Sequence, residues 1–261
     1  MDNLEKNLEI VDKCFLTEAF QRENFQISEK KADLLICFYQ LLIEKNKVMN
    51  LTGITEFPQV VCKHFLDSVY GGRLIDSICG DKMADHCPDL SVIDVGTGAG
   101  FPGIPLKICY PELKVTLMDS LNKRVGFLKE AIDALCLTDI YAVHSRAEEL
   151  GRNPEYREQF DCAVSRAVAD LAVLSEYCLP FVKTGGKFLS YKGGNVEEEL
   201  NHSIKAIEML GGRVAEVQKF SYPVGKEEIC QRSIVVIEKV KETSKKYPRK
   251  AGTPGKTPLG R

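Results

Sequence analysis

The sequence predicts an α/β fold, in which a mostly parallel seven-stranded sheet ends in an antiparallel hairpin and follows an N-terminal helical extension. Three observations support this prediction. From residue 90 onward, short apolar runs alternate with amphipathic stretches of about 12 to 15 residues, as in βα units around a parallel sheet. The first apolar run leads into a glycine-rich turn. The last two runs follow each other with no helical stretch between them.

The first 75 residues are predicted to be helical. Apolar residues in the stretch SEKKADLLICFYQLLIEKNK recur at the helical period, and Ser28 is a suitable N-cap. Residues 50–53 break the pattern, and a further helix is expected after Pro58. That helix carries His64 and Asp67 on one face, where we interpret them as capping or core hydrogen-bonding residues rather than catalytic ones. The apolar positions of the first helix are Leu34, Leu35, Phe38, Leu41 and Leu42.

The sheet region contains seven predicted strands. The last two are separated by turn residues and no helix, so they should pair as an antiparallel hairpin at one edge of the sheet. The strands are expected at 91–95, 114–119, 140–144, 160–165, 186–191, 213–220 and 232–239, and helices at 121–135, 171–182 and 196–210.

The ten cysteines predict a protein of the reducing cytosol. The chain has 261 residues, of which 44% are hydrophobic, and no C-x-x-C pair suggests a zinc site or a redox dithiol. The longest apolar run, 34–43, is too short to span a bilayer, and the N-terminus is too charged for a signal peptide. We therefore expect a cytoplasmic protein with no metal site and no membrane contact.

Charge divides the chain unevenly. Residues 241–261 contain seven Lys or Arg and one Glu, whereas the chain as a whole has a formal net charge of -2. A basic tail on an acidic body is typical of an arm that binds phosphate, although a solvated, disordered terminus has the same composition. We predict a helical cap (1–75), a ligand-binding α/β domain (76–240) and a basic tail (241–261) that is extended or disordered when alone.

The glycine loop VIDVGTGAGFPGIPL limits the ligand of this domain. A phosphate-binding P-loop needs a Lys-Ser or Lys-Thr pair that the loop lacks. The dinucleotide fingerprint needs a third glycine where Phe101 stands, after Gly96 and Gly98. The observed pattern, Asp94 followed by alternating glycines, looks like the first motif of Rossmann-like methyltransferases. The loop therefore favours S-adenosylmethionine over NAD.

Two further strand ends support an adenosine ligand. Asp119 ends the second strand, where an acidic side chain can accept both ribose hydroxyls. After the third strand, Ala147 and Glu148 stand where a backbone N–H and a carboxylate can read the adenine edge. A solvated acid in the first turn of a helix would be the simpler interpretation of Glu148 alone. The three motifs in chain order favour cofactor binding.

The end of the fourth strand suggests the reaction. It lacks the [D/N]-P-P-[Y/F] motif that is typical of methyltransferases acting on exocyclic amines. Methylation of pyrimidine C5 needs a cysteine nucleophile, but Cys162 lies inside the strand and is interpreted as a core residue. An acceptor with a free lone pair, such as guanine N7, needs no general base, so alignment and electrostatics suffice. Arg166 at the strand end is expected near the transferred methyl group, in an electrostatic or positioning role.

Motifs along nearly the whole chain resemble the RsmG (GidB) family, whose members methylate guanine N7 in 16S ribosomal RNA. The resemblance implies a Rossmann-like class I S-adenosylmethionine-dependent methyltransferase fold and a 16S rRNA or small-subunit substrate; we expect a monomer. The motifs are Asn50-Leu51-Thr52, His64-x-x-Asp67-Ser68, the glycine loop, Arg146-Ala147-Glu148, Ser165-Arg166-Ala167, Lys192-Gly193 and the tail from Tyr247 to Leu259.

The resemblance also implies roles for individual residues. Gly96, Phe101, Ala147, Glu148 and Arg166 would contact the cofactor, and Lys192, Arg249, Lys250 and Lys256 would contact RNA phosphate. Removing residues 245–261 should then weaken RNA binding and leave cofactor affinity intact. Two other functions stay open on the sequence alone: a NAD-dependent oxidoreductase, which Phe101 disfavours, and a non-catalytic RNA-binding protein with a nucleotide fold.

Overall fold

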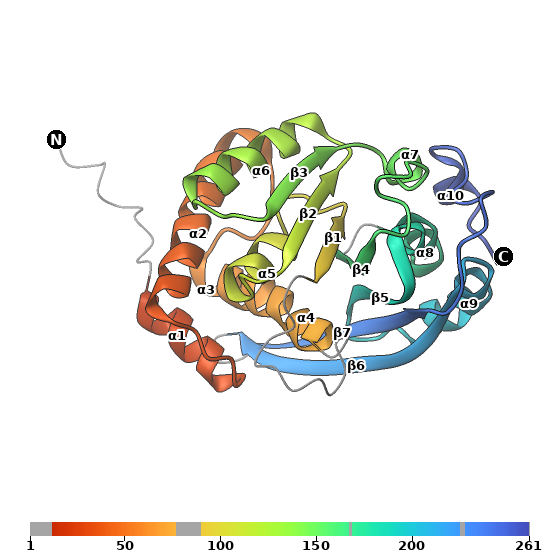
Figure 1. Ribbon diagram of the computed structural model, residues 1–261. Coiled ribbons are helices and arrows are strands. Elements are labelled where there is room, and N and C mark those ends of the chain that lie inside the picture. The colour runs from red at the N-terminus through yellow and green to blue at the C-terminus, as the bar shows by residue number, and fades with distance from the viewer. Residues whose placement is uncertain (1–11, 77–89, 167–168, 225–227, 261) are drawn as a thin grey trace.

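The computed structural model describes residues 12–76, 90–166, 169–224 and 228–260, and these form a seven-stranded sheet with helices on both faces (Figure 1). The strand order is β3-β2-β1-β4-β5-β7-β6. The strands are β1 Ser91–Val95, β2 Lys114–Asp119, β3 Ile140–His144, β4 Phe160–Arg166, β5 Val182–Gly193, β6 Gly212–Val224 and β7 Glu228–Lys239.

The first five strands are parallel, and the last two form the predicted antiparallel hairpin. β7 pairs antiparallel with β5 and with β6. The chain order reverses between β1 and β4, so the carboxyl ends of these two strands flank a switch point, where ligands bind in open α/β sheets. The predicted architecture is therefore confirmed.

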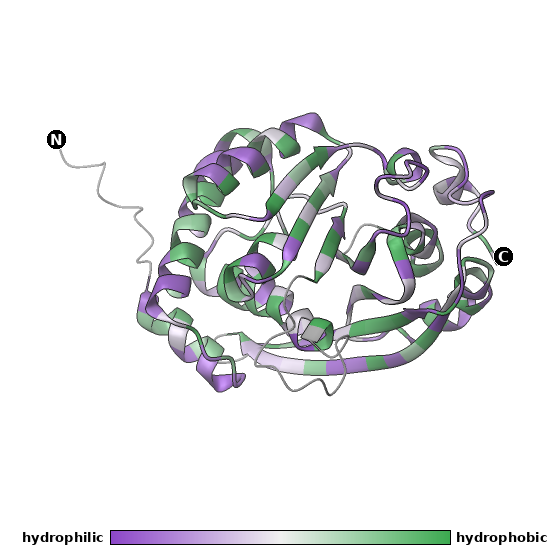
Figure 2. Cartoon of the chain, viewed as in Figure 1, coloured by the Kyte–Doolittle hydropathy of each residue, from purple (hydrophilic) through white to green (hydrophobic). Residues whose placement is uncertain are grey.

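Alternate residues of each strand point to opposite faces of the sheet, and each face has its own apolar core. Val92 and Val164 pack with the helices α1 to α6 on one face, whereas Ile93 and Ala163 pack with α7 to α9 on the other. Figure 2 shows the resulting pattern, with hydrophobic strands inside and helices that are hydrophilic on their outer sides. The N-terminal helices thus share a continuous core with the sheet.

The N-terminal helices follow the predicted pattern closely. The Ser28 side chain accepts a hydrogen bond from the Lys31 N–H, and Asn50 ends the long helix in a left-handed conformation. Asp67 begins α4 directly after a π-helical turn, Val61–Leu66. The helices are α1 Lys13–Arg22, α2 Glu29–Met49, α3 Phe57–Val60 and α4 Asp67–Asp76. The predicted boundary between 75 and 76 lies beside residues 77–89, which are outside the described residues.

The remaining helices connect the strands. The helix predicted at 171–182 is shorter, because the chain tightens into a 3-10 turn containing Pro180 and enters β5 at Val182. These helices are α5 Gly103–Cys109, α6 Asn122–Ala134, α7 Ala147–Leu150, α8 Leu171–Cys178 and α9 Glu197–Met209.

The C-terminal tail is ordered against the domain, so the prediction of an extended or disordered tail is wrong for residues 242–260. Tyr247 and Leu259 are buried in the core of the α8 side, and a short helix, α10 Thr253–Lys256, lies beside α8. Composition failed to predict this because the groups that hold the tail belong to other parts of the chain.

No metal-binding group of three or more His, Cys, Asp or Glu occurs among the described residues. None of the helices in the described ranges is long and apolar enough to cross a membrane. Eight cysteines are described and all are free thiols, with Cys162 fully buried in its strand as predicted. Cys79 and Cys87 lie outside the described residues.

A two-pocket candidate active site

The glycine loop follows β1 and presents its backbone at the carboxyl edge of the sheet. Gly96, Gly98 and Gly100 all have positive φ angles, of 74°, 60° and 96°. The N–H groups of Gly96 and Thr97 donate to the carbonyl of Met118 and tie the loop to β2. A Cβ atom on Gly98 would meet nothing within 4 Å, so the loop is open to a ligand there.

Asp94 lies fully buried beneath the loop. Its Oδ2 accepts hydrogen bonds from the Thr97 hydroxyl at 2.6 Å and from the Gly103 N–H at 2.8 Å. Its Oδ1 has no hydrogen-bond partner among the described residues. Burial raises the pKa of Asp94 to about 7, against the opposing effect of these two hydrogen bonds. A ligand that brings positive charge would favour the ionised carboxylate.

Asp119, at the end of β2, is also buried. It accepts hydrogen bonds from the Gly98 N–H at 3.0 Å and the Leu121 N–H at 2.9 Å. The Arg124 guanidinium lies 3.5 Å from the same carboxylate. A carboxylate offers about four lone-pair sites, so Asp119 keeps acceptor capacity for hydroxyl groups.

Phe101 fills the place of the third glycine with a buried ring. The centroids of the Phe101 and His64 rings are 4.5 Å apart, and the Arg166 guanidinium lies 5.0 Å from the Phe101 centroid. Phe38 of α2 packs against Phe101 at 5.4 Å. The N-terminal helices therefore complete this side of the site.

Arg166, at the end of β4, is held by the N-terminal helices. Its NH1 donates to the Asp67 carboxylate at 3.0 Å and to the Lys63 carbonyl at 3.1 Å. On the far side of the same carboxylate, Arg232 Nε lies 3.3 Å from Asp67 Oδ1. Asp67 thus bridges two arginines. The predicted core hydrogen bond of Asp67 is confirmed, and its partner, Arg166, lines the site.

His64 contacts the same guanidinium and is uncharged. Its Nδ1 lies 3.2 Å from Arg166 NH2, and its Nε2 lies 2.9 Å from the Thr52 hydroxyl. Burial, and then the charge of Arg166, lower the pKa of His64 to about 3. The ring is therefore neutral at physiological pH and acts as a polar wall.

Two pockets meet at His64 and Arg166. The first, of about 230 Å³, is lined by the glycine loop, and the second, of about 300 Å³, is lined by residues of β5 and β7; both include His64 and Arg166. The first pocket is also lined by Leu51, Thr52, residues 96–99, Phe101 and Arg124. The second is also lined by Ile54, Lys63, Asp67, Tyr191, Lys192, Gly193 and Arg232.

The second pocket is rich in cations, each with an acidic neighbour. Lys192 Nζ lies 2.6 Å from the Glu199 carboxylate and donates to the Ala169 carbonyl, so its side chain is nearly buried. Lys63 Nζ lies 2.8 Å from Glu228. The pairs hold the cations at the pocket wall, where an anionic ligand would compete with the carboxylates.

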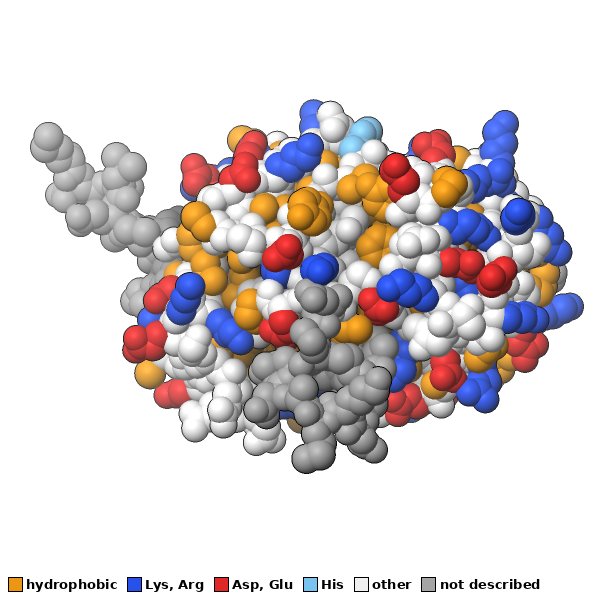
Figure 3. All heavy atoms as spheres, in the orientation of Figure 1, with side chains coloured by type: hydrophobic (Ala, Val, Ile, Leu, Met, Phe, Trp, Pro, Cys, Tyr) orange, Lys and Arg blue, Asp and Glu red, His pale blue; other side chains and the backbone are white. Residues whose placement is uncertain are grey.

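The other predicted residues lie around α7 and the tail. The Glu148 side chain is buried and accepts a hydrogen bond from the Gly252 N–H at 2.8 Å. Arg249 is ion-paired with the buried Glu176, whereas Lys250 and Lys256 are exposed. Lys and Arg side chains gather on the side of the molecule where α9 and α10 lie (Figure 3). The structure therefore separates the predicted tail cations into one anchor and two exposed lysines.

Thr52, Lys63 and Arg232 are among the pocket residues that sequence reasoning missed. Thr52 stands in the Asn50-Leu51-Thr52 motif, but its hydrogen bond to His64 depends on how the segment between α2 and α3 packs against the turn that carries His64. Arg232 carries no local signal. It reaches the pocket because the antiparallel register pairs it with Gly193, next to Lys192.

Comparison with known proteins agrees with this geometry. A family model described as rRNA small subunit methyltransferase G matches residues 31–235. Ribosomal RNA small subunit methyltransferase G of Alkaliphilus metalliredigens is 48% identical over 247 residues, 95% of this chain and 98% of the relative. The protein of that name from Lachnoclostridium phytofermentans is 52% identical over 222 residues, 85% and 87% of the two chains.

Among solved structures, a mutant of MtNAS in complex with S-adenosylmethionine is similar in fold. Its TM-score is 0.50 at 14% identity, and the match covers 88% of this chain and 85% of that one. Another structure of an MtNAS mutant gives a TM-score of 0.52 and covers 88% and 83%. At this identity the likeness concerns the fold alone.

Proposed function

Because this chain belongs to the rRNA small subunit methyltransferase G (GidB) family, we propose that it transfers the methyl group of S-adenosylmethionine to N7 of a guanosine in 16S ribosomal RNA. The class I methyltransferase fold predicted from the sequence is confirmed. Neither the oxidoreductase nor the non-catalytic alternative receives support from the family or from the relatives.

One observation carries the proposal: the two pockets share His64 and Arg166. A methyltransferase must hold the methyl donor and the acceptor base on either side of one point, because in-line transfer needs both at contact distance. We assign the donor to the pocket over the glycine loop and the acceptor guanosine to the cationic pocket. Arg166 and His64 would then lie beside the transferred methyl group.

The residues of the first pocket fit the donor. The exposed backbone of Gly98 allows close approach, and the unpaired Oδ1 of buried Asp94 suits the methionine ammonium, directly or through a water. Asp119 is proposed to accept the ribose hydroxyls, and Ala147 and Glu148 to contact the adenine. Gly96 and Phe101 would line the pocket. When bound, S-adenosylmethionine supplies an electrophilic methyl group on its sulfonium.

The chain's own residues position the acceptor rather than deprotonate it. Guanine N7 carries a free lone pair, so no side chain has to remove a proton before attack. The pKa of His64 is lowered to about 3, which makes its ring a weak base, and Asp67 is ion-paired with two arginines; both agree with a site that has no general base. Arg166 is proposed to orient the methionine carboxylate or the base, without the bidentate grip on guanine O6 and N7 that would block the reacting atom.

The residues proposed to contact RNA differ in the exposure of their side chains. Lys250 and Lys256 are exposed and are proposed to contact phosphates. Lys192 lines the acceptor pocket, and its pair with Glu199 would have to open for a phosphate. Arg249 is expected to serve the RNA only indirectly, because Glu176 occupies its guanidinium. The division into a helical cap (1–75), a methyltransferase domain (76–240) and a C-terminal tail (241–261) is part of this proposal, as is a monomeric enzyme.

The test is methyl transfer from tritiated S-adenosylmethionine to small ribosomal subunits from a strain that lacks the enzyme. We expect labelled 16S rRNA with these subunits and none with subunits that are already methylated. Labelling of no RNA in any preparation, by protein that binds S-adenosylhomocysteine, would favour the non-catalytic alternative.

A further inference from the structure

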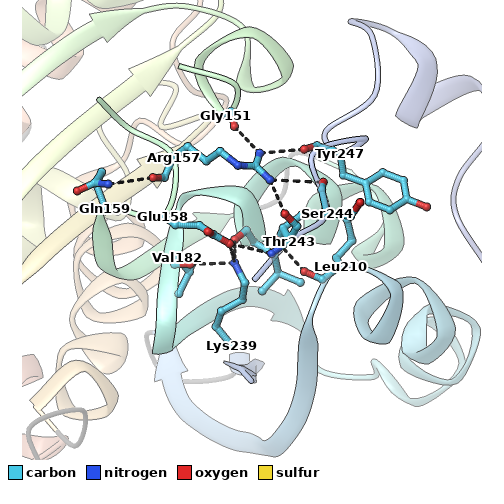
Figure 4. A network of polar contacts seen from close by, with 11 residues as sticks. Gly151, Arg157, Glu158, Gln159, Val182, Leu210, Lys239, Thr243, Ser244 and Tyr247 are labelled. Atoms are coloured by element: carbon cyan, nitrogen blue, oxygen red, sulfur yellow. Dashed lines mark hydrogen bonds and ion pairs between the residues drawn. The ribbon is translucent and has the colours of Figure 1, made fainter. Parts of the chain in front are cut away.

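The C-terminal segment, defined as residues 242–260, is built into the domain by a network of polar contacts (Figure 4). The Arg157 guanidinium donates to the carbonyls of Thr243 at 2.6 Å and Tyr247 at 2.9 Å. The Thr243 N–H donates to the Glu158 carboxylate at 2.8 Å, which also lies 3.0 Å from the fully buried Lys239 ammonium. The segment takes part in these contacts through its backbone groups, so they fix its path whatever its side chains are.

A second anchor lies further along the segment. Arg249 donates from Nε at 2.9 Å and from NH2 at 2.7 Å to the Glu176 carboxylate of α8, which is fully buried. The Arg249 N–H adds a third contact at 2.7 Å. A buried carboxylate of this kind needs its cation, so the pair fixes the chain directly before Gly252.

From this anchor the segment reaches the adenine side of the proposed donor pocket. The Gly252 N–H donates to Glu148 Oε1 at 2.8 Å, and within the described residues no hydrogen bond engages Oε2. Glu148 is in the first turn of α7, and Ser145, three residues earlier, donates its N–H to the Asp119 carbonyl at 3.2 Å. The carboxylate held by Gly252 therefore lies on α7, directly after the loop that is tied to the proposed ribose-binding residue.

We infer that the C-terminal segment is a positioning element of the cofactor site: the Gly252 N–H holds Glu148 so that Oε2 accepts from the exocyclic amine of adenine. This inference rests on the proposed function, because it assigns a ligand to Glu148. It gives the segment two separate tasks, since its exposed lysines contact RNA and its backbone holds the cofactor site. It also reverses the expectation from sequence that removing the tail leaves cofactor affinity intact.

Two variants break the Gly252 contact and keep the Arg249 anchor. The first ends the chain after Lys250. The second, Gly252→Ala, places a side chain at φ +79°, where L residues are strained although the space is open. Gly255→Ala is the matched control, because Gly255 lies in α10 with an ordinary φ, and a Cβ there would only touch the Tyr177 hydroxyl at 3.9 Å.

The experiment is isothermal titration of each variant with S-adenosylhomocysteine and with its deamino analogue, in which a hydrogen atom replaces the exocyclic amine of adenine. We expect the truncation to weaken S-adenosylhomocysteine binding about tenfold and Gly252→Ala about fivefold, in the range of the net contribution of one hydrogen bond, with no change for Gly255→Ala. Neither variant should weaken binding of the deamino analogue further, because that ligand has no N–H donor for Oε2 at this edge of the base. A segment that only stabilises the fold would weaken both ligands alike.

Three results would overturn the inference. The first is an unchanged affinity of the truncated chain for S-adenosylhomocysteine, and the second is tighter binding of that ligand, which would make the Gly252 contact autoinhibitory. The third is an equal loss of affinity for both ligands. Failure of the proposed function looks different. In that case the wild-type chain itself binds neither homocysteine nucleoside, which overturns the inference together with the proposed function.

Discussion

The glycine loop and the C-terminal segment both surround the proposed cofactor, yet only the loop was understood from sequence. In the loop, the backbone itself forms the proposed binding surface, and the alternating glycines indicate its conformation directly. Gly98 has φ +60°, and a Cβ atom there would meet nothing within 4 Å. For residues 241–261, which include the segment, seven Lys or Arg residues predicted a phosphate-binding arm. The structure pairs one of them, Arg249, with the buried Glu176 and leaves Lys250 and Lys256 exposed.

The difference shows what a local sequence pattern contains. A glycine loop carries its own conformational constraint, whereas the role of a basic residue depends on which carboxylate the fold brings to it. Arg249 and Glu176 are 73 residues apart in the chain, and no spacing predicts their contact. Each prediction below contrasts an anchored residue with a neighbour or a matched control.

The largest effect is expected for Arg249→Ala, which leaves the fully buried Glu176 carboxylate without its cation. Removing one partner of a buried pair costs about 3 to 5 kcal/mol of unfolding free energy. Lys250→Ala, one residue further, should change it by less than about 0.5 kcal/mol. Urea unfolding of both variants measures this, and equal stabilities would mean that the anchor is not formed in solution.

Arg166→Ala should lower kcat/KM for small-subunit methylation about 100-fold, equivalent to about 2.7 kcal/mol, because it removes the group shared by both pockets. Asp67 keeps Arg232 as its partner, so stability should fall less than activity. The exposed Arg213, paired with Glu238, provides a control in Arg213→Ala. Wild-type turnover in Arg166→Ala would remove this residue from the site.

Cofactor affinity should depend on pH through Asp94. Its pKa is raised to about 7 in the free protein, so the carboxyl group is increasingly protonated below that pH. An ammonium beside it favours the carboxylate, so binding must release a proton there, and affinity for S-adenosylhomocysteine should fall up to about tenfold per pH unit below 7. Calorimetric titration with S-adenosylhomocysteine at pH 6 to 8 tests this, with Asp94→Asn as the pH-independent control. A wild-type affinity that does not change with pH would show that Asp94 does not contact the ammonium.

The smallest effects concern the exposed lysines. Lys250→Ala and Lys256→Ala should each reduce the slope of log affinity for RNA against log salt by about 0.7 to 0.9, with cofactor affinity unchanged. Lys13→Ala is the control, because Lys13 pairs with Asp33 on the N-terminal helices. Filter binding over a range of salt concentrations measures the slope. Identical slopes in all four proteins would show that these lysines do not meet phosphate.

The sheet was predictable because buried parallel strands appear as short apolar runs. β1, β2 and β3 have the predicted bounds, whereas β6 and β7 extend further toward their common turn than the apolar pattern indicated. Those polar extensions are stabilised by hydrogen bonds between the two strands, which the apolar periodicity of the sequence does not indicate.

The site was predictable only in part. Gly98 and Asp119 meet as expected, because motifs at neighbouring strand ends share one edge of the sheet. The cluster of Asp67 with Arg166 and Arg232 was not predictable, because it joins a helix, a strand end and the terminal hairpin, each with an ordinary local sequence.

The identity of the methylated nucleoside tests the central claim most directly. Small subunits methylated by the purified chain are digested to nucleosides, and the labelled product is identified by chromatography and mass spectrometry. Two adjoining pockets without a general base predict 7-methylguanosine in 16S rRNA, with the label lost in Arg166→Ala. A methyl group on an exocyclic amine, a ribose hydroxyl or a pyrimidine carbon would contradict the account.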